Sequence, residues 1–295
     1  MRKSLKESEL VLNTDGSIYH LHLHPGQLAS NVVLVGDPQR VALLSSQFER
    51  IDHAVQNREF VTHTGLFRGV PVSVVGTGIG TDNIDIVVNE LDAVVNIDLS
   101  TRRIREERTS LRLLRLGTTG LLQPDVAVGT PVASVWGLGL DALLRFYRPG
   151  PGILDEELGR LAVECTGGRL AAGEPYAVKA SAGLLEAIGG DMLQGITLTA
   201  PGFYAPQGRM LRLEAADPGL SHRLAGLVHQ GHRVLNFEME TSALYGLGRM
   251  LGHEVLTVCL AVANRANGKF MADYHAEMRA LGTRVLERLC ALGAG

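Results

Sequence analysis

Short apolar runs alternate with amphipathic segments along this 295-residue chain, and this alternation constrains the fold more than any other feature. The apolar runs have strand length and lie at residues 31–36, 70–78, 113–120, 129–136, 195–200, 233–240 and 253–264. Helical spacing is found at residues 38–48, 82–95, 153–167, 241–252 and 273–292. Strands that alternate with helices predict an α/β architecture with a largely covered sheet. Since no repeat, low-complexity tract or linker interrupts the pattern, we predict one domain over 1–295.

Composition excludes several classes of protein. The formal net charge of −3 gives no general attraction to nucleic acid. No apolar run approaches the roughly 18 residues of a membrane span, and the N-terminus lacks the apolar region of a secretory signal. Three cysteines form an odd set without metal-ligand spacing, which favours free thiols in a reducing compartment. We therefore expect a cytoplasmic protein without a nucleic-acid or membrane partner.

Two polar motifs follow apolar runs, where α/β sheets bind ligands. In GDPQR (36–40), Gly36 allows close approach of an anion and Arg40 offers a guanidinium suited to phosphate. The alternative is a plain turn into a helix, with Asp37 as N-cap and Pro38 at its first position. In RLGTTG (115–120), Arg115 lies within an apolar strand that we expect to end in a turn. Arg115 is therefore either a phosphate ligand, aided by the Thr118 and Thr119 hydroxyls, or half of a buried ion pair.

The motif GFYAPQGR (202–209) combines aromatic and polar side chains. Phe203 and Tyr204 offer a face for a flat heterocycle. Gln207 carries both a donor and an acceptor, whereas Arg209 carries only donors, a set that suits the edge of uracil. The alternative is a surface loop whose aromatic rings pack on the protein body.

In NFEMETSAL (236–244), Glu238 and Glu240 flank Met239 at the end of an apolar run. Residues two apart share one face of a strand, so both carboxylates would reach into the same site. A carboxylate is a good acceptor for the vicinal hydroxyls of a ribose, and methionine offers an adaptable apolar surface beside the sugar. The alternative is a salt-bridged pair of acids near a helix start.

Two further segments carry weaker signals. In GTGIGTDN (76–83) the glycine spacing departs from G-x-G-x-x-G, which argues against dinucleotide binding. The segment 98–112 holds five arginines and three acids in fifteen residues. Its mixed charge favours a solvated surface helix or hairpin, with an oligomer contact as the alternative.

Taken together, eight motifs resemble the uridine phosphorylase branch of the nucleoside phosphorylase family. They lie in family order from residue 19 to residue 265, and they are YHLHL (19–23), GDPQR (36–40), NREF (57–60), TGIG (77–80), RLGTTGLLQPDVAVG (115–129), FYAPQGR (203–209), NFEMETSAL (236–244) and AVANR (261–265). The resemblance implies a mixed central β-sheet that closes toward a barrel and is flanked by helices.

The resemblance also implies residue roles. Phosphate ligands would be Gly36, Arg40, Arg58, Arg115 and Thr118, and ribose ligands would be His20, Met239 and Glu240. Base contacts would come from Phe203, Gln207 and Arg209, with Arg209, Gln207 and Arg115 acting in catalysis. Arg58 and His20 would enter from a neighbouring subunit, which implies a homo-oligomer with a dimer as minimal unit, often assembled into a hexamer.

The implied reaction is reversible phosphorolysis of uridine to uracil and ribose 1-phosphate by a pentosyltransferase, with inorganic phosphate as co-substrate and no cofactor. Three departures from the family stand out: segment 98–112 resembles an insertion, Asn57 replaces an expected histidine, and Asp82 and Asn83 argue against a potassium site near Glu59. A purine nucleoside phosphorylase, which would favour an acid where this chain has Asn264, and a nucleoside-binding relative without turnover are the alternatives.

Overall fold

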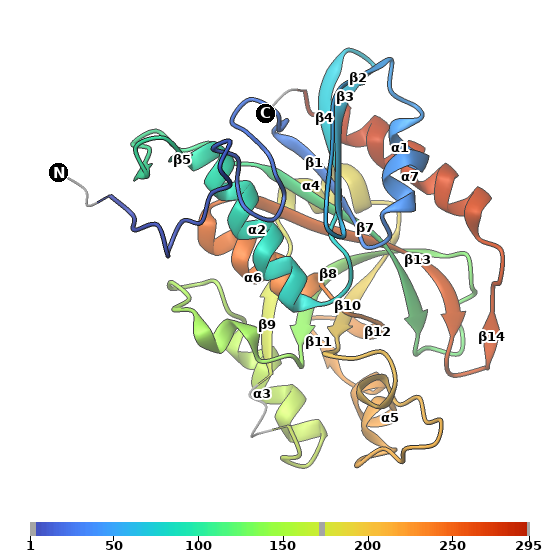
Figure 1. Ribbon diagram of the computed structural model, residues 1–295. Helices are drawn as coiled ribbons and strands as arrows, with labels where there is room; N and C mark the ends of the chain where they lie inside the picture. The colour runs from blue at the N-terminus through green and yellow to red at the C-terminus, as the bar shows by residue number, and fades with distance from the viewer. Residues whose placement is uncertain (1–3, 171–174, 294–295) are drawn as a thin grey trace.

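A twelve-stranded mixed sheet forms the centre of the protein in a computed structural model that describes residues 4–170 and 175–293. Its order is β11-β12-β10-β8-β13-β7-β1-β4-β3-β2, with β14 paired to β13 and β9 paired to β8 (Figure 1). The strands are β1 (Asn31–Val35), β2 (Arg50–Asn57), β3 (Phe60–Phe67), β4 (Val70–Gly76), β7 (Arg112–Leu121), β8 (Pro131–Gly139), β9 (Tyr176–Lys179), β10 (Leu193–Thr199), β11 (Val228–His229), β12 (His232–Glu238), β13 (Glu254–Asn264) and β14 (Lys269–Phe270).

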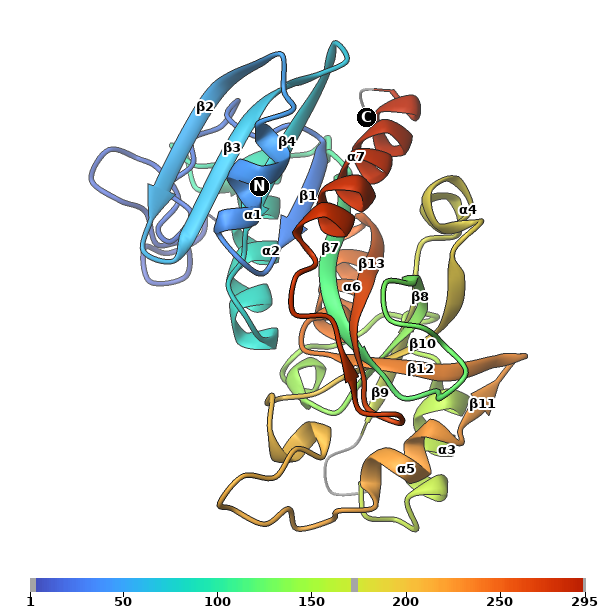
Figure 2. The ribbon, with the colours of Figure 1, turned by 90° about the vertical axis from the view of Figure 1, so that its right-hand side faces the viewer.

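Five of these strands close into a ring. β12 returns antiparallel to β7, with Asn236 opposite Leu121 and Phe237 opposite Gly120. This pairing joins β7, β13, β8, β10 and β12 into a barrel, seen at the centre of Figure 2. The predicted mixed sheet that closes toward a barrel is therefore confirmed.

Seven α-helices flank the sheet in the described part of the chain (Figures 1 and 2). They are α1 (Gln39–Ser45), α2 (Thr81–Asn96), α3 (Glu156–Cys165), α4 (Ala182–Gly189), α5 (Leu220–Ala225), α6 (Thr241–Leu251) and α7 (His275–Ala291). Gly252 ends α6 in a left-handed conformation with φ of 85°, as its sequence predicts. Across residues 4–170 and 175–293, no helix is long and apolar enough to span a bilayer.

Three features differ from the sequence predictions or refine them. The expected turn at the end of the Arg115 run is wrong, because β7 continues to Leu121 with partners in both β13 and β12. The apolar run from residue 233 ends as a strand at Glu238, so Glu240 stands at the start of α6 instead. Segment 98–112 contains one arm of a small surface hairpin, β5 (Ile97–Asp98) and β6 (Arg103–Ile104), in agreement with the hairpin interpretation.

Helix α6 packs so closely on β8 that one position tolerates only glycine. A Cβ atom on Gly137 would lie 2.9 Å from both the backbone nitrogen and the Cα of Ser242. Because backbone atoms cannot move aside cheaply, we expect Gly137→Ala to lower the free energy of unfolding by about 1–3 kcal/mol. Urea denaturation of this variant beside Gly150→Ala, where a new Cβ meets nothing within 4 Å, provides the measurement. Equal stability of the two variants would contradict the close approach.

Candidate active site

A cavity of about 720 Å³ lies where strands β1, β7, β12 and β13 end. This volume lies within the usual range for small-molecule sites. Nine of the predicted site residues line it, namely Gly36, Arg40, Arg115, Thr118, Phe203, Gln207, Arg209, Met239 and Glu240. His20 and Arg58 do not line the cavity of their own chain. The cavity thus brings together four motifs that are far apart in the sequence.

Arg115 lies buried between the two carboxylates of the 236–244 motif. Its Nη1 is 3.2 Å from Glu238 Oε2, and its Nη2 forms an ion pair with Glu240. Gly117 makes room for this side chain, since a Cβ there would lie 2.2 Å from Arg115 Nη1. Burial disfavours the charge of Arg115, but the two carboxylates outweigh it and raise the pKa of the guanidinium. The ion-pair interpretation of Arg115 is therefore confirmed, although its Nε remains buried without a partner among the described residues.

Glu238 stabilises the N-terminus of α6 by hydrogen bonds. Its carboxylate accepts hydrogen bonds from Thr199 Oγ1 at 2.7 Å and from the backbone N–H groups of Glu240 and Thr241, each at 2.9 Å. A negative charge is favourable there, because the first N–H groups of a helix lack partners within it. The interpretation of the acids as a salt-bridged pair near a helix start is confirmed.

Glu240 borders the cavity and has a hydrogen-bond partner other than those of Glu238. Its Oε1 accepts the backbone N–H of Gly80 at 2.8 Å. Burial raises the pKa of the Glu240 carboxyl, and the charge of Arg115 opposes that rise. The two acids do not share a strand face as predicted. Both carboxylates nevertheless contact the Arg115 guanidinium, which lies between them.

Beside this ion-pair cluster, Arg40 supplies a cation that is not neutralised. Within the described part of the chain, its guanidinium makes no hydrogen bond or ion pair, and yet it lines the cavity with Gly36 and Thr118. The predicted turn into a helix is present, but it is shifted by one residue: Pro38 and not Asp37 is the N-cap of α1, and Asp37 Oδ1 accepts the N–H of Gln39 at 2.9 Å from the position before it. This end of the cavity is suited to an anion.

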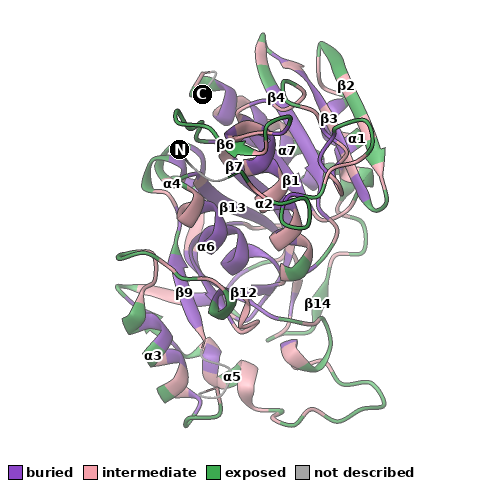
Figure 3. Ribbon diagram, turned by 60° about the vertical axis from the view of Figure 1, so that its left-hand side comes forward, coloured by how far each residue is buried: buried purple, intermediate pink, exposed green. Residues whose placement is uncertain are grey.

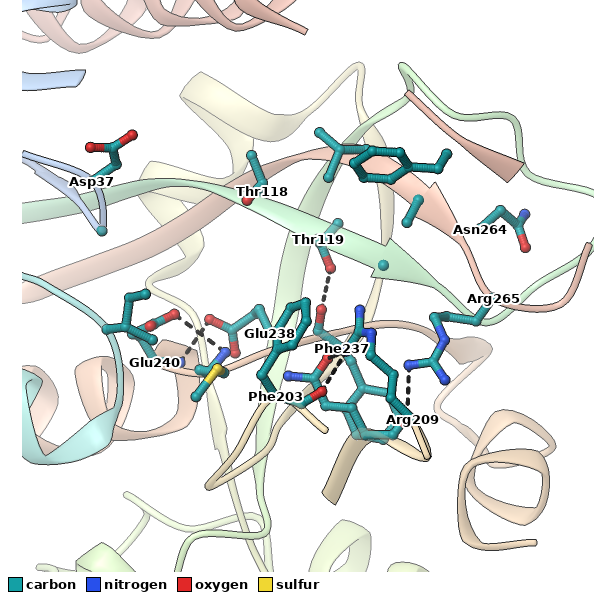
Figure 4. A pocket seen from close by; sticks show the side chains of 18 of the residues that line it. Asp37, Thr118, Thr119, Phe203, Arg209, Phe237, Glu238, Glu240, Asn264 and Arg265 are labelled. Atoms are coloured by element: carbon teal, nitrogen blue, oxygen red, sulfur yellow. Dashed lines mark hydrogen bonds between the residues drawn. The ribbon is translucent and has the colours of Figure 1, made fainter. Parts of the chain in front are cut away.

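The other end of the cavity combines an aromatic face with two guanidinium groups. Figure 4 shows Arg209 and Arg265 on one side and Glu238 and Glu240 on the other. The Arg209 guanidinium lies 3.8 Å from the centre of the Phe203 ring and donates to the Phe203 carbonyl at 2.7 Å. Burial, with the nearby charge of Arg265, lowers the pKa of Arg209 to about 10. Neither guanidinium has a carboxylate partner among the residues that the structure describes, and this favours a ligand edge that carries or develops negative charge.

Arg265 is the main lining residue that the sequence analysis leaves without a role. Its Nη1 donates to the Gln207 carbonyl at 2.7 Å, and burial lowers its pKa. Gly120 lies against both arginines, since a Cβ there would be 3.7 Å from Arg209 Nη2 and 3.6 Å from Arg265 Cδ. The available signal was its position as a cation directly after the buried run of β13.

Asn264 lines the cavity, but its side chain forms hydrogen bonds with the protein backbone. Its Nδ2 donates to the carbonyls of Gln123 and Val126 at 2.9 and 2.7 Å, and its Oδ1 accepts the N–H of Ala266 at 2.9 Å. The residue is 1% exposed. Its amide groups are therefore committed to the backbone, not offered to a ligand.

The chain and its fold match a known family. The model of the phosphorylase superfamily matches residues 31–294, and the chain belongs to that superfamily. A uridine phosphorylase of Thermococcus kodakarensis is 31% identical over 92% of this chain and 86% of its own length. A DeoD-type purine nucleoside phosphorylase of Hahella chejuensis is 26% identical over 85% of this chain and 88% of its own.

Solved structures agree with this assignment. The nucleoside phosphorylase of Trypanosoma brucei, described as showing uridine phosphorylase activity, superimposes with a TM-score of 0.87. It shares 28% identity with this chain, and the match covers 96% of this chain and 99% of the other. The similarity therefore spans the barrel and the cavity as well as the flanking helices.

Proposed function

We propose that the protein catalyses the reversible phosphorolysis of uridine to uracil and ribose 1-phosphate. The observation that carries this proposal is the order of groups along one cavity. An unneutralised Arg40 stands at one end, a buried carboxylate borders the middle, and a ring with two guanidinium groups closes the other end. The uridine phosphorylases among the relatives support the same activity.

At the anion end, Arg40, Arg115 and Thr118 would hold phosphate beside Gly36, whose missing side chain allows close approach. Phosphate is itself the nucleophile, so the reaction needs no covalent enzyme intermediate and no cofactor. The contribution of the protein is to position phosphate beneath C1′ of the ribose and to balance its charge.

In the middle and at the far end, the nucleoside would be bound by Glu240, Met239 and the Phe203 loop. Glu240 would accept the 2′- and 3′-hydroxyls, and Met239 would pack on the sugar. As the glycosidic bond breaks, negative charge grows on uracil, where Gln207 and Arg209 donate. These hydrogen bonds strengthen toward the transition state, which is the condition for accelerating the reaction.

Two of the predicted ligands require a second copy of the chain. Because Arg58 and His20 do not line their own cavity, we propose that they complete the cavity of a neighbouring subunit. The minimal unit would then be a dimer, and a hexamer would be a trimer of such dimers.

We propose that the chain is a single domain in which segment 98–112 is an insertion. This segment could contact other subunits of the oligomer. The thiols Cys165, Cys259 and Cys290, all unpaired, support a cytoplasmic location.

A phosphate-dependence assay over a small nucleoside panel tests the proposal. We expect uridine cleavage to rise with phosphate concentration and to give ribose 1-phosphate, with inosine cleaved more slowly. The engaged amide of Asn264 and the Gln207–Arg209 pair favour a pyrimidine over a purine. Cleavage that is indifferent to phosphate would indicate a nucleosidase, and preference for inosine would indicate a purine nucleoside phosphorylase. Binding without cleavage would indicate a relative that has lost turnover.

A further inference from the structure

Glu90 of α2 forms hydrogen bonds with a turn of the chain that lies 70 residues earlier. Its carboxylate accepts the backbone N–H of His20 at 3.0 Å and that of Leu21 at 2.8 Å. It also pairs with the His20 ring through Nδ1 at 2.6 Å. Three groups thus converge on one carboxylate, and hydrogen bonds to a charged acceptor are stronger than neutral ones.

This arrangement decides which ring nitrogen of His20 is available. Because the carboxylate can only accept, the hydrogen-bond network assigns the proton between them to Nδ1 of His20. Nε2 is then left as the nitrogen that can meet a ligand, and the side chain remains 27% exposed. A hydrogen bond at one nitrogen commonly fixes the orientation and the basicity of the other.

The tip of the β2–β3 hairpin also forms hydrogen bonds with this turn. Asn57 Nδ2 donates to the His20 carbonyl at 2.8 Å. The next residue, Arg58, lies 5.1 Å from the centre of the Tyr19 ring and donates to the Tyr19 hydroxyl at 3.2 Å. His20 and Arg58 are therefore held as one unit, which gives the asparagine at position 57 a structural reason.

We infer that Glu90 is a positioning residue for His20, which it holds with Nε2 directed toward the ribose 5′-hydroxyl of a nucleoside in the neighbouring subunit. This inference rests on the proposed function and deepens it. Glu90 touches no substrate itself. Its effect is to supply a single imidazole tautomer in a single orientation before the nucleoside arrives, so that less ordering is needed on binding.

The experiment compares uridine with 5′-deoxyuridine, which lacks the hydroxyl that His20 would contact. In Glu90→Gln, we expect kcat/KM to fall about tenfold on uridine and less than about twofold on 5′-deoxyuridine. The ratio of the two values does not depend on the amount of folded enzyme, so a partly unfolded variant does not obscure the result. Glu186→Gln, which removes an exposed carboxylate on α4, is the matched control and should leave both values unchanged.

Two further variants make the test stricter. His20→Ala is expected to erase the preference for uridine, and Glu90→Gln added to it is expected to change the ratio no further, since the two residues act as one unit. An equal loss on both substrates in Glu90→Gln would overturn the inference, as would a wild-type protein that cleaves both equally well. A wild-type protein without phosphate-dependent cleavage of uridine would overturn the proposed function itself, and this inference with it.

Discussion

Replacing Arg115 by methionine is expected to lower the free energy of unfolding by about 3–5 kcal/mol. The substitution leaves Glu238 and Glu240 buried, each 3% exposed, without the cation that lies between them. Methionine has a similar length and apolar stem, so the main loss is the charge and not the volume. Urea denaturation followed by circular dichroism gives the measurement, with an unchanged m-value as the sign that only stability has changed.

A charge-balanced variant separates the stabilising role of Arg115 from its proposed role in phosphate binding. Arg115→Met combined with Glu240→Gln removes one charge of each sign, so we expect it to recover part of the stability but none of the activity. Arg160→Met on α3 is the control. Arg160 and its partner Glu164 are 57% and 56% exposed, so that change should cost at most about 1 kcal/mol. A similarly small cost for Arg115→Met would show that the buried cluster does not stabilise the fold.

The sequence predicts the strands that appear as continuous apolar runs, and it misses β2, β3 and β9, which lack such runs. Strands β1, β8 and β13 are almost wholly buried and appear as continuous apolar runs. β2 reads RIDHAVQN and has no buried residue, so no apolar run marks it, and Figure 3 shows it as largely exposed. Its strand character comes from pairing with β3, which is a tertiary contact and leaves little trace in the local sequence.

For the site, the sequence identifies the side chains but not how they meet. Arg115 is singled out by its charge within an apolar run, and Glu238 and Glu240 by their charge at the end of one. Their convergence depends on the antiparallel pairing of β7 with β12, which joins residues more than a hundred positions apart. The sequence gives Arg265 no role for the same reason, because its relevance appears only beside Arg209 and Gly120.

The second large effect is expected for Arg209→Ala, which should lower kcat on uridine by about 10²–10³-fold. Arg209 is the guanidinium held on the Phe203 ring at the base end, and it would stabilise charge that appears on uracil only as the bond breaks. Because such an interaction is weaker in the ground state, KM should change much less than kcat. Steady-state kinetics at saturating phosphate gives both constants. Arg212→Ala is the control, since Arg212 is exposed on the same loop and should leave both unchanged.

The leaving group provides a further test of this role for Arg209. A base that carries negative charge more easily than uracil needs less help from a cation. The loss caused by Arg209→Ala should therefore be smaller on 5-fluorouridine than on uridine, whereas a merely structural defect would slow both substrates by the same factor. Equal losses would indicate that Arg209 shapes the loop around Phe203 and Gln207 without stabilising the departing base. The charge on uracil would then be met elsewhere, and Arg265, which is partly buried and lines the same cavity, would be the group to replace next.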